Sequence, residues 1–93
     1  MIWLIMDSIL SIKNNIRDRA RNKRKALKLS QEELAKRSGV SFGSVKRFEN
    51  TGEISLTSLL KIAVILESEE DFNSLFSRRN YLSLQEVIDE TQE

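Results

Sequence analysis

Hydrophobic residues recur at helical spacing over most of the chain, and this pattern predicts an all-α fold. The first helix is expected at about residues 8–27, with Asp7 and Ser8 capping its start. Its apolar residues are separated by three, four, four and seven positions and should share one inward face: Ile9, Ile12, Ile16, Ala20 and Leu27. We expect no internal repeat and no heptad seam.

Two shorter helices are expected within residues 30–50, joined by a tight turn at 38–40. Ser30 and Glu33 have the spacing of a capping box, in which each side chain satisfies a backbone N–H of the other residue. Gly39 stands where the first of these helices must end and the backbone needs a positive φ. Ser41 can cap the second. The positions expected to point inward are apolar: Leu34, Ala35, Val45 and Phe48.

The other side of the second short helix is expected to be exposed. It carries Phe42, Gly43, Ser44, Lys46 and Arg47. A short basic helix held across a partner helix by a tight turn is the geometry that enters the DNA major groove. An ordinary helical hairpin with a solvated charged face would give the same local pattern, so the rest of the chain must decide between them.

After a turn at residues 51–53, Ser55 can cap a fourth helix. Its apolar residues lie on nearly all sides, so we expect a central buried helix or a subunit contact: Leu56, Leu59, Leu60, Ile62, Ala63, Val64, Ile65 and Leu66. Ser68 and Asp71 can cap a short fifth helix that carries Phe72, Leu75 and Phe76. A second capping box at residues 83–86 predicts a terminal helix with a polar tail.

Residues 1–6 form an apolar run, MIWLIM, that lacks the basic start, longer apolar stretch and cleavage site of a secretory signal. One interpretation is a strand or extended arm that buries Trp3 and Ile5 against its own core or a second copy of the chain. The other is a start-site artefact, with Met6 as the native beginning. We favour burial at a homodimer contact, since exposed runs of this kind promote aggregation.

Charge divides the chain into two halves. Residues 11–50 carry twelve Lys and Arg against four Asp and Glu, whereas residues 51–93 carry three against nine. A basic half is typical of proteins that bind a polyanion, and an acidic half should face away from it. The first helix concentrates this charge in one span: Arg17, Arg19, Arg21, Lys23, Lys25 and Lys28. Such density of like charge suits a helix that lies opposite phosphates.

Arg24 falls on the inward side of the first helix and needs a partner, because an unpaired buried charge is costly. Glu49, at the end of the second motif helix, is the candidate.

Composition leaves little room for catalysis or metal binding. The chain has no cysteine and no histidine, which removes disulfides, the usual zinc ligands and the commonest general base. Adjacent carboxylates at helix starts suit the helix dipole rather than acid–base chemistry. Ser44 and Lys46 lie two positions apart and do not face each other on a helix. We therefore expect no enzyme, no cofactor, no small-molecule substrate and no membrane span.

Residues 16–66 resemble the Cro/C1-type (XRE) helix-turn-helix domain. The resemblance is carried by Leu27-x-Leu29-Ser30, Gln31-Glu32-Glu33-Leu34-Ala35, Ser38-Gly39-Val40-Ser41, Val45-x-x-Phe48-Glu49 and Leu59-Leu60-x-x-Ala63. It implies a five-helix, lambda-repressor-like domain at residues 11–77, with an apolar arm or helix start at 1–10 and an acidic helix and tail at 78–93. It also implies a cytoplasmic homodimer on a two-fold symmetric operator.

The resemblance also assigns site residues. Gln31 would hold a phosphate, the recognition positions match residues 42–44, 46 and 47, and Arg24 with Glu49 matches an internal ion pair. We expect further DNA contacts from Ser41, Arg21 and Lys25. Phe42 and Gly43 stand where Gln or Arg is more usual, so the amide-to-adenine pairing is not expected. Phe42 would instead meet a thymine methyl or a base step, and Lys46 and Arg47 would supply the donors.

Two further readings stay open. The sequence of residues 43–60 and the acidic tail resemble those of regulators encoded beside HipA-type toxin kinases. This resemblance indicates a HipB-like antitoxin that binds a partner toxin through the acidic half. RNA binding through the basic helix ranks last, because few exposed aromatic residues could stack on bases.

Overall fold

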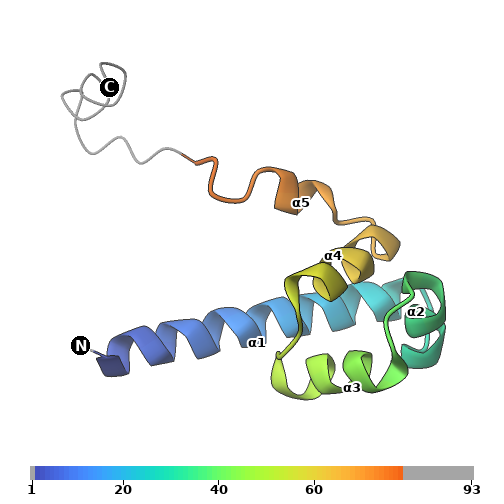
Figure 1. The fold of residues 1–93 in the computed structure, drawn as a ribbon, viewed down its shortest axis with the longest axis horizontal. Helices are drawn as coiled ribbons and strands as arrows, with labels where there is room; N and C mark the ends of the chain where they lie inside the picture. The colour runs from blue at the N-terminus through green and yellow to red at the C-terminus, as the bar shows by residue number, and fades with distance from the viewer. Residues whose placement is uncertain (1, 79–93) are drawn as a thin grey trace.

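The computed structural model describes residues 2–78, and this part of the chain is all-helical, without strands. Five helices follow one another: α1 (Ile2–Ala26), α2 (Gln31–Ser38), α3 (Phe42–Thr51), α4 (Leu56–Ile65) and α5 (Glu70–Asn73). The second, third and fourth helices gather around the C-terminal half of α1, whose N-terminal half projects away from them (Figure 1). The all-α fold class predicted from hydrophobic spacing is confirmed.

The first helix is longer than predicted. It begins at Ile2, so the expectation of a strand or extended arm at residues 2–6 is wrong, as is the expected start near Ser8. Asp7 and Ser8 lie inside the helix and cap nothing. The chain contains no proline, and residues 2–26 contain no glycine, so nothing in this stretch interrupts the helix. It ends at Ala26, and two residues later the chain turns at Lys28, which adopts a left-handed φ of 59°.

The predicted caps of α2 and α3 are present. The Ser30 hydroxyl accepts a hydrogen bond from the Glu33 N–H, and the Glu33 carboxylate accepts one from the Ser30 N–H, both at 3.0 Å. Gly39 ends α2 with a φ of 76°, and its N–H donates to the Ala35 carbonyl. Ser41 caps α3 by accepting from the Ser44 N–H at 3.1 Å. These local contacts fix the angle at which α3 leaves α2.

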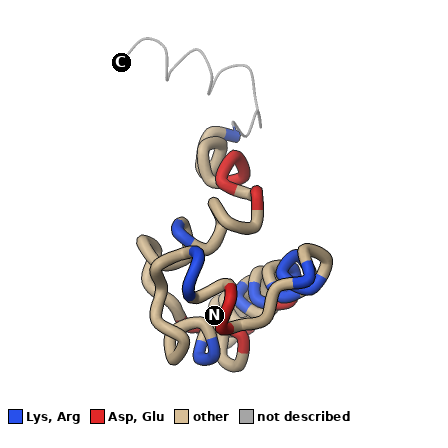
Figure 2. Tube along the Cα trace, turned by 90° about the vertical axis from the view of Figure 1, so that its right-hand side faces the viewer, with Lys and Arg blue, Asp and Glu red and all other residues tan. Residues whose placement is uncertain are grey.

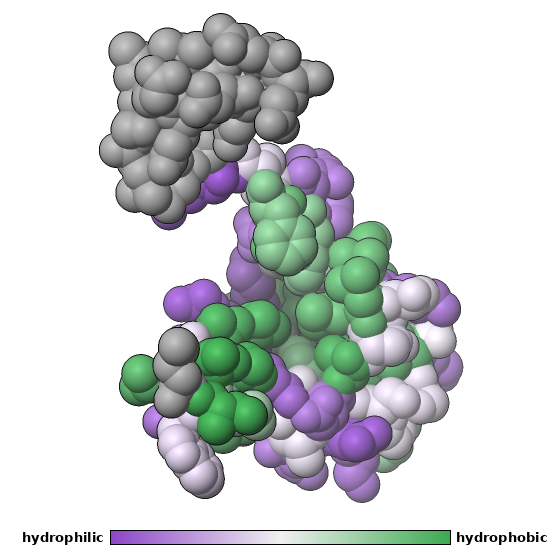
Figure 3. All heavy atoms as spheres, turned by 60° about the vertical axis from the view of Figure 1, so that its left-hand side comes forward, coloured by the Kyte–Doolittle hydropathy of each residue, from purple (hydrophilic) through white to green (hydrophobic). Residues whose placement is uncertain are grey.

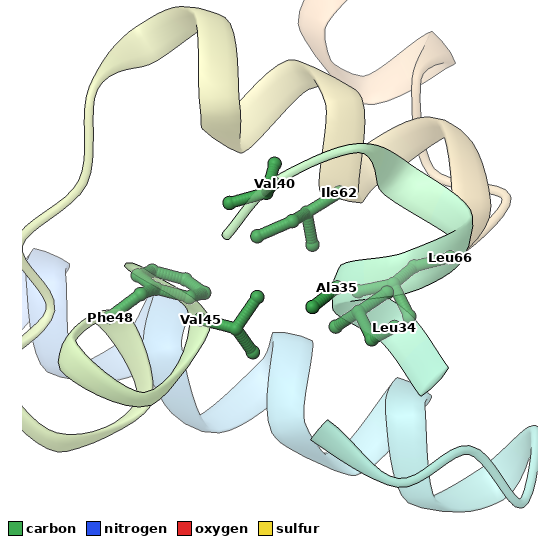
Figure 4. Close-up of a cluster of buried hydrophobic side chains, with 7 residues drawn as sticks. All are labelled: Leu34, Ala35, Val40, Val45, Phe48, Ile62 and Leu66. Atoms are coloured by element: carbon green, nitrogen blue, oxygen red, sulfur yellow. The ribbon is translucent and has the colours of Figure 1, made fainter. Parts of the chain in front are cut away.

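The core lies between α2, α3 and α4. Its buried side chains are Leu34, Ala35, Val40, Val45, Phe48, Ile62 and Leu66, which point toward one another in Figure 4. Ala20 on α1 packs against this group together with Ile54, Leu59 and Ile65. Val45 is fully buried, which means that one side of α3 is committed to the core.

The fourth helix is not a central buried helix, so the first of its two predicted roles is wrong, and the other, a subunit contact, stays a prediction. Only Ile62 and Ala63 of α4 are buried, and Leu56 and Val64 remain 63% and 54% exposed. A helix on the outside of a four-helix cluster can bury only one stripe, and the remaining apolar side chains face solvent in the single chain. The predicted cap is present, because the Ser55 hydroxyl accepts from the Ser58 N–H.

The turn before α4 is shifted by one residue. Thr51 still belongs to α3, and Gly52 ends the helix with a φ of 78°. A Cβ at Gly52 would lie 3.2 Å from the Cβ of Lys13, so this glycine also permits a close approach between the end of α3 and α1.

The predicted inward face of α1 is largely exposed. Ile9, Ile12, Ile16 and Leu27 have exposed fractions between 37% and 55%, and only Ala20 of this set packs against the core. There are two physical reasons. The first turns of α1 project beyond the other helices (Figure 1). At Ile12 and Ile16, the end of α3 contacts the next residue, Lys13 or Arg17, on another side of α1. Figure 3 shows a dense apolar group over the projecting first turns of α1.

The fifth helix is shorter than predicted. It spans only four residues, and the Ser68 hydroxyl donates to the Leu66 carbonyl instead of capping it. Leu75 and Phe76 lie beyond its end and are exposed. The capping box and helix predicted at residues 83–88, and the tail after them, lie outside the described residues.

Candidate nucleic-acid interface

The outer side of α3 forms a continuous exposed surface. Val45, Phe48 and Glu49 point inward and are buried. The intervening positions are exposed: Phe42, Gly43, Ser44, Lys46 and Arg47. This is the set predicted from the sequence, and the structure brings all five onto one short helix. We call these five residues the α3 outer face.

The first turn of α3 is closed by serine side chains. The Ser41 hydroxyl accepts from the Ser44 N–H and donates to the Ser44 hydroxyl at 2.8 Å. Gly43 adds no side chain to this turn, and a Cβ built there would meet nothing within 4 Å. The backbone at Gly43 can therefore be approached closely by a partner, and Ser41 and Ser44 offer hydroxyls beside it.

Lys46 lies over the ring of Phe42, with its Nζ atom 5.0 Å from the ring centroid. The two residues are one helical turn apart, so the contact forms within α3 itself. A cation above an aromatic face is attracted by the ring's quadrupole, which orders both side chains at the surface. The α3 outer face thus presents an ammonium group and an apolar ring side by side.

The inner end of α3 is tied to α1 by a buried charge cluster. The Glu49 carboxylate accepts hydrogen bonds from Arg24 Nε at 2.7 Å and Arg24 Nη2 at 2.8 Å. Arg24 also donates from Nη1 to the Leu29 carbonyl at 2.9 Å. Both side chains are buried, and the contact is bidentate, the strong form of an arginine–carboxylate pair. The partner predicted for Arg24 from burial is therefore the one it has.

Two of the residues predicted to contact DNA also reach this cluster. Gln31 Nε2 donates to Glu49 Oε1 at 3.0 Å. Arg21 donates from Nε to the same oxygen at 3.4 Å and from Nη2 to the Glu49 carbonyl. Sequence reasoning missed both contacts. The signal that could have found them is the number of acceptor sites on a buried carboxylate, which one arginine does not fill.

Burial by itself raises the pKa of the Glu49 carboxyl. Hydrogen bonds from Arg24, Gln31 and Arg21, with the charge of Arg24, lower this pKa more, so it lies below its ordinary value. Glu49 is therefore ionised at neutral pH. Its contacts with Arg24 and Arg21 tie the end of α3 to α1.

The two helices that contact α3 also carry exposed cations. Lys25 on α1 and Lys36 and Arg37 at the end of α2 are exposed. In Figure 2, acidic residues gather in the segment around α5, whereas the rest of the described chain shows lysine and arginine together with several acidic residues. Within the described residues, α1 to α3 carry the excess of positive charge and the segment around α5 carries an excess of negative charge.

No helix within residues 2–78 combines the length and apolar character needed to cross a membrane. The same residues hold no group of three or more candidate metal ligands.

A family model described as helix-turn-helix matches residues 21–73, which is more than half of the chain. The chain therefore belongs to the Cro/C1-type (XRE) helix-turn-helix family and has the fold of a DNA-binding regulator. Comparisons with curated proteins and with solved structures give no match. The matched residues begin within α1 and contain α2, α3, α4 and α5, so the helix pair and its α3 outer face lie inside the family domain.

Proposed function

We propose that this regulator is a sequence-specific repressor that acts in the cytoplasm as a homodimer on a palindromic operator. The observation that carries the proposal is the α3 outer face, which combines exposed donors with a rigid attachment to α1. Rigid presentation matters because a recognition helix must hold several side chains in register with base edges at once.

Within this proposal, each residue of the α3 outer face has a role set by its chemistry. Arg47 and Lys46 donate to base edges or phosphates. Phe42 provides an apolar surface for a thymine methyl or a base step, and Gly43 lets the backbone approach the duplex. Ser41 and Ser44 lie where hydroxyls can meet phosphate oxygens.

Three residues outside α3 complete the proposed interface. Lys25 adds an exposed cation on α1. Gln31 and Arg21 are half-buried and hydrogen-bonded to Glu49 in the DNA-free chain. We propose that both also reach phosphates, with Gln31 at the start of α2, where backbone N–H groups favour an anion.

The test is selection of binding sites from random double-stranded DNA, followed by gel shifts on the selected sequence at increasing salt. We expect a two-fold symmetric site with half-sites about 34 Å apart, and affinity that falls steeply with salt. Loss of reporter expression from a promoter carrying the site would support repression. Selection that enriches no sequence, with equal affinity for unrelated DNA, would overturn the proposal.

A second candidate is an antitoxin that binds a partner toxin through its acidic half. The observation that favours it is the exposed apolar stripe of α4, which lies in that half and includes Leu56, Leu60 and Val64. Co-purification of the full chain with the product of the neighbouring gene tests this idea. A DNA-bound complex that contains both proteins would support it, and absence of the second protein would reject it.

A further inference from the structure

Residues 2–16 of α1 carry five isoleucines on one stripe. They recur at intervals of three, four, three and four residues: Ile2, Ile5, Ile9, Ile12 and Ile16. All five are exposed in the single chain, from 66% at Ile2 to 37% at Ile16. We call this stripe the isoleucine seam. The expectation of no heptad seam is therefore wrong, because the first two members lie in the stretch that was predicted to be a strand.

The seam has the properties of a contact between identical helices. Its mean spacing of 3.5 residues is that of positions a and d of a heptad, which insert into gaps on a facing helix. Within residues 2–16 the only charged residues are Asp7 and Lys13, and neither lies on the seam. Two copies can therefore bring their seams together without opposing like charges.

We infer that the isoleucine seam pairs with the same seam of a second copy of this chain, with the two α1 helices antiparallel. The direction follows from what lies beyond Ile16. The next two heptad positions are Arg19 and Lys23, within the basic span of α1. A parallel pair would place these cations opposite their own copies, whereas an antiparallel pair sends the two basic spans to opposite ends.

The attachment of α3 to α1 determines where the two recognition helices would lie. Lys13 forms an ion pair with Glu53 just after α3, and Arg17 donates to the Asn50 carbonyl at 3.4 Å. Each directly follows a seam residue, Ile12 or Ile16, so α3 lies about 100° around α1 from the seam. It is thus to one side of the plane that contains both α1 helices. The two-fold axis of an antiparallel pair is perpendicular to that plane and puts both α3 helices on the same side.

The separation of the two domains can also be estimated. In the heptad, Ile2, Ile9 and Ile16 occupy position a, and Ile5 and Ile12 occupy position d. An antiparallel pair can face each a residue with a d residue in two registers, in which Ile9 lies opposite either Ile12 or Ile5 of the partner subunit. At about 1.5 Å per residue, the two copies of Ala20 would then be roughly 30 to 40 Å apart along the helices. This range includes the ~34–36 Å between half-sites on successive turns of DNA. Only this last comparison rests on the proposed function.

The first test measures the mass of the full chain without DNA, by light scattering after gel filtration. We expect a dimer. The double variant Ile5→Lys/Ile12→Lys should be a monomer that still unfolds cooperatively, because both side chains are exposed in the single chain. Its thermal midpoint should no longer depend on protein concentration, since no partner subunit stabilises the folded state. Leu4→Lys/Ser11→Lys is the matched control, with the same added charge one position earlier on the outer side of α1. It should remain a dimer.

Three outcomes would overturn the proposed pairing of two isoleucine seams. One is a monomeric wild-type chain at tens of micromolar, which would mean that residues 79–93 of this chain or another protein cover the isoleucines. Another is a trimer, the state that isoleucine at both heptad positions favours in parallel coiled coils. The third is equal dissociation of the seam variant and the control variant.

The second test decides direction and uses the absence of cysteine from the chain. Ile9→Cys alone, and a mixture of Ile9→Cys with either Ile5→Cys or Ile12→Cys, are oxidised and analysed by mass spectrometry. Antiparallel pairing predicts a mixed disulfide in one of the two mixtures and none between copies of Ile9→Cys. Efficient cross-linking of Ile9→Cys to itself would reject the antiparallel arrangement. If DNA selection fails while the seam variants still dissociate a DNA-free dimer, the proposed function is rejected and the seam is retained.

Discussion

Arg24 on α1 donates hydrogen bonds to both carboxylate oxygens of Glu49 on α3, with N–O distances of 2.7 and 2.8 Å. This pair joins the last turn of the exposed helix to the longest helix of the fold. Gln31, at the start of α2, donates to the same carboxylate, so one acidic side chain connects three helices. The orientation of the α3 outer face therefore depends on a single buried group.

Removing this carboxylate should lower the stability of the domain. Glu49→Ala leaves Arg24 buried with only the Leu29 carbonyl as a partner, and we expect a loss of about 3 kcal/mol in the free energy of unfolding. Urea denaturation measures it. The matched double variant Arg24→Met/Glu49→Leu should recover much of the loss, since it removes both charges and keeps apolar volume. An unchanged denaturation midpoint for Glu49→Ala would show that the pair does not stabilise the fold.

Acid should weaken the same contact. The pKa of Glu49 is lower in the folded chain than its ordinary value, so its contribution is complete above the unfolded pKa of about 4.3. The contribution is lost as pH falls through the lower, folded pKa. The stability difference between wild type and Glu49→Gln should therefore be largest near neutral pH and shrink below about pH 4. A difference that stays constant from pH 7 to pH 3 would mean that Glu49 does not titrate with unfolding.

Lys46→Ala and Arg47→Ala should weaken binding to the selected operator without changing the thermal midpoint, because both side chains are exposed. A base contact should cost about 1–3 kcal/mol and relax specificity at one position, whereas a phosphate contact should reduce the salt slope by about one. Fluorescence anisotropy at several salt concentrations separates the two cases. Lys61→Ala on α4 is the control for loss of an exposed cation. Equal loss of binding in that control would point to net charge alone.

The two glycines of the motif should respond to alanine in opposite ways. Gly43→Ala meets open space in a helix and should raise stability by up to about 1 kcal/mol, while it weakens operator binding through the added methyl group. Gly39 has open space too, but its φ of 76° makes alanine cost roughly 1–2 kcal/mol of stability. Thermal melts and anisotropy on both variants test this. Normal DNA binding by Gly43→Ala would show that the backbone there does not approach the duplex.

Local patterns predicted most of the motif because each depends on residues close in sequence. The capping box of Ser30 and Glu33 and the left-handed end of α2 at Gly39 follow from backbone chemistry within one turn. The same holds for the outward set on α3, since Val45 and Phe48 fix which side is buried. Arg24 and Glu49 could be paired across 25 positions only because an inward charge requires an opposite one.

The extent of α1 could not be predicted in the same way. An apolar run such as residues 2–6 fits a strand or a buried helix equally well by pattern, and helix starts have weak signals when no cap precedes them. The structure resolves this by continuing α1 to Ile2. The roles of Gln31 and Arg21 at Glu49 were missed for a related reason, because three helices must be assembled before one carboxylate can be seen to have several donors.

The amino-acid sequence by itself determined the helical class, the caps of α2, α3 and α4, the division of charge along the chain and the side of α3 that faces outward, because these depend on periodicity and on neighbours within a few residues. Only the tertiary structure decided that α1 extends beyond the other helices and that α3 contacts it on another side, which together leave the isoleucine seam exposed. Packing decides this, since whether an apolar stripe is buried depends on how far the other helices reach along it.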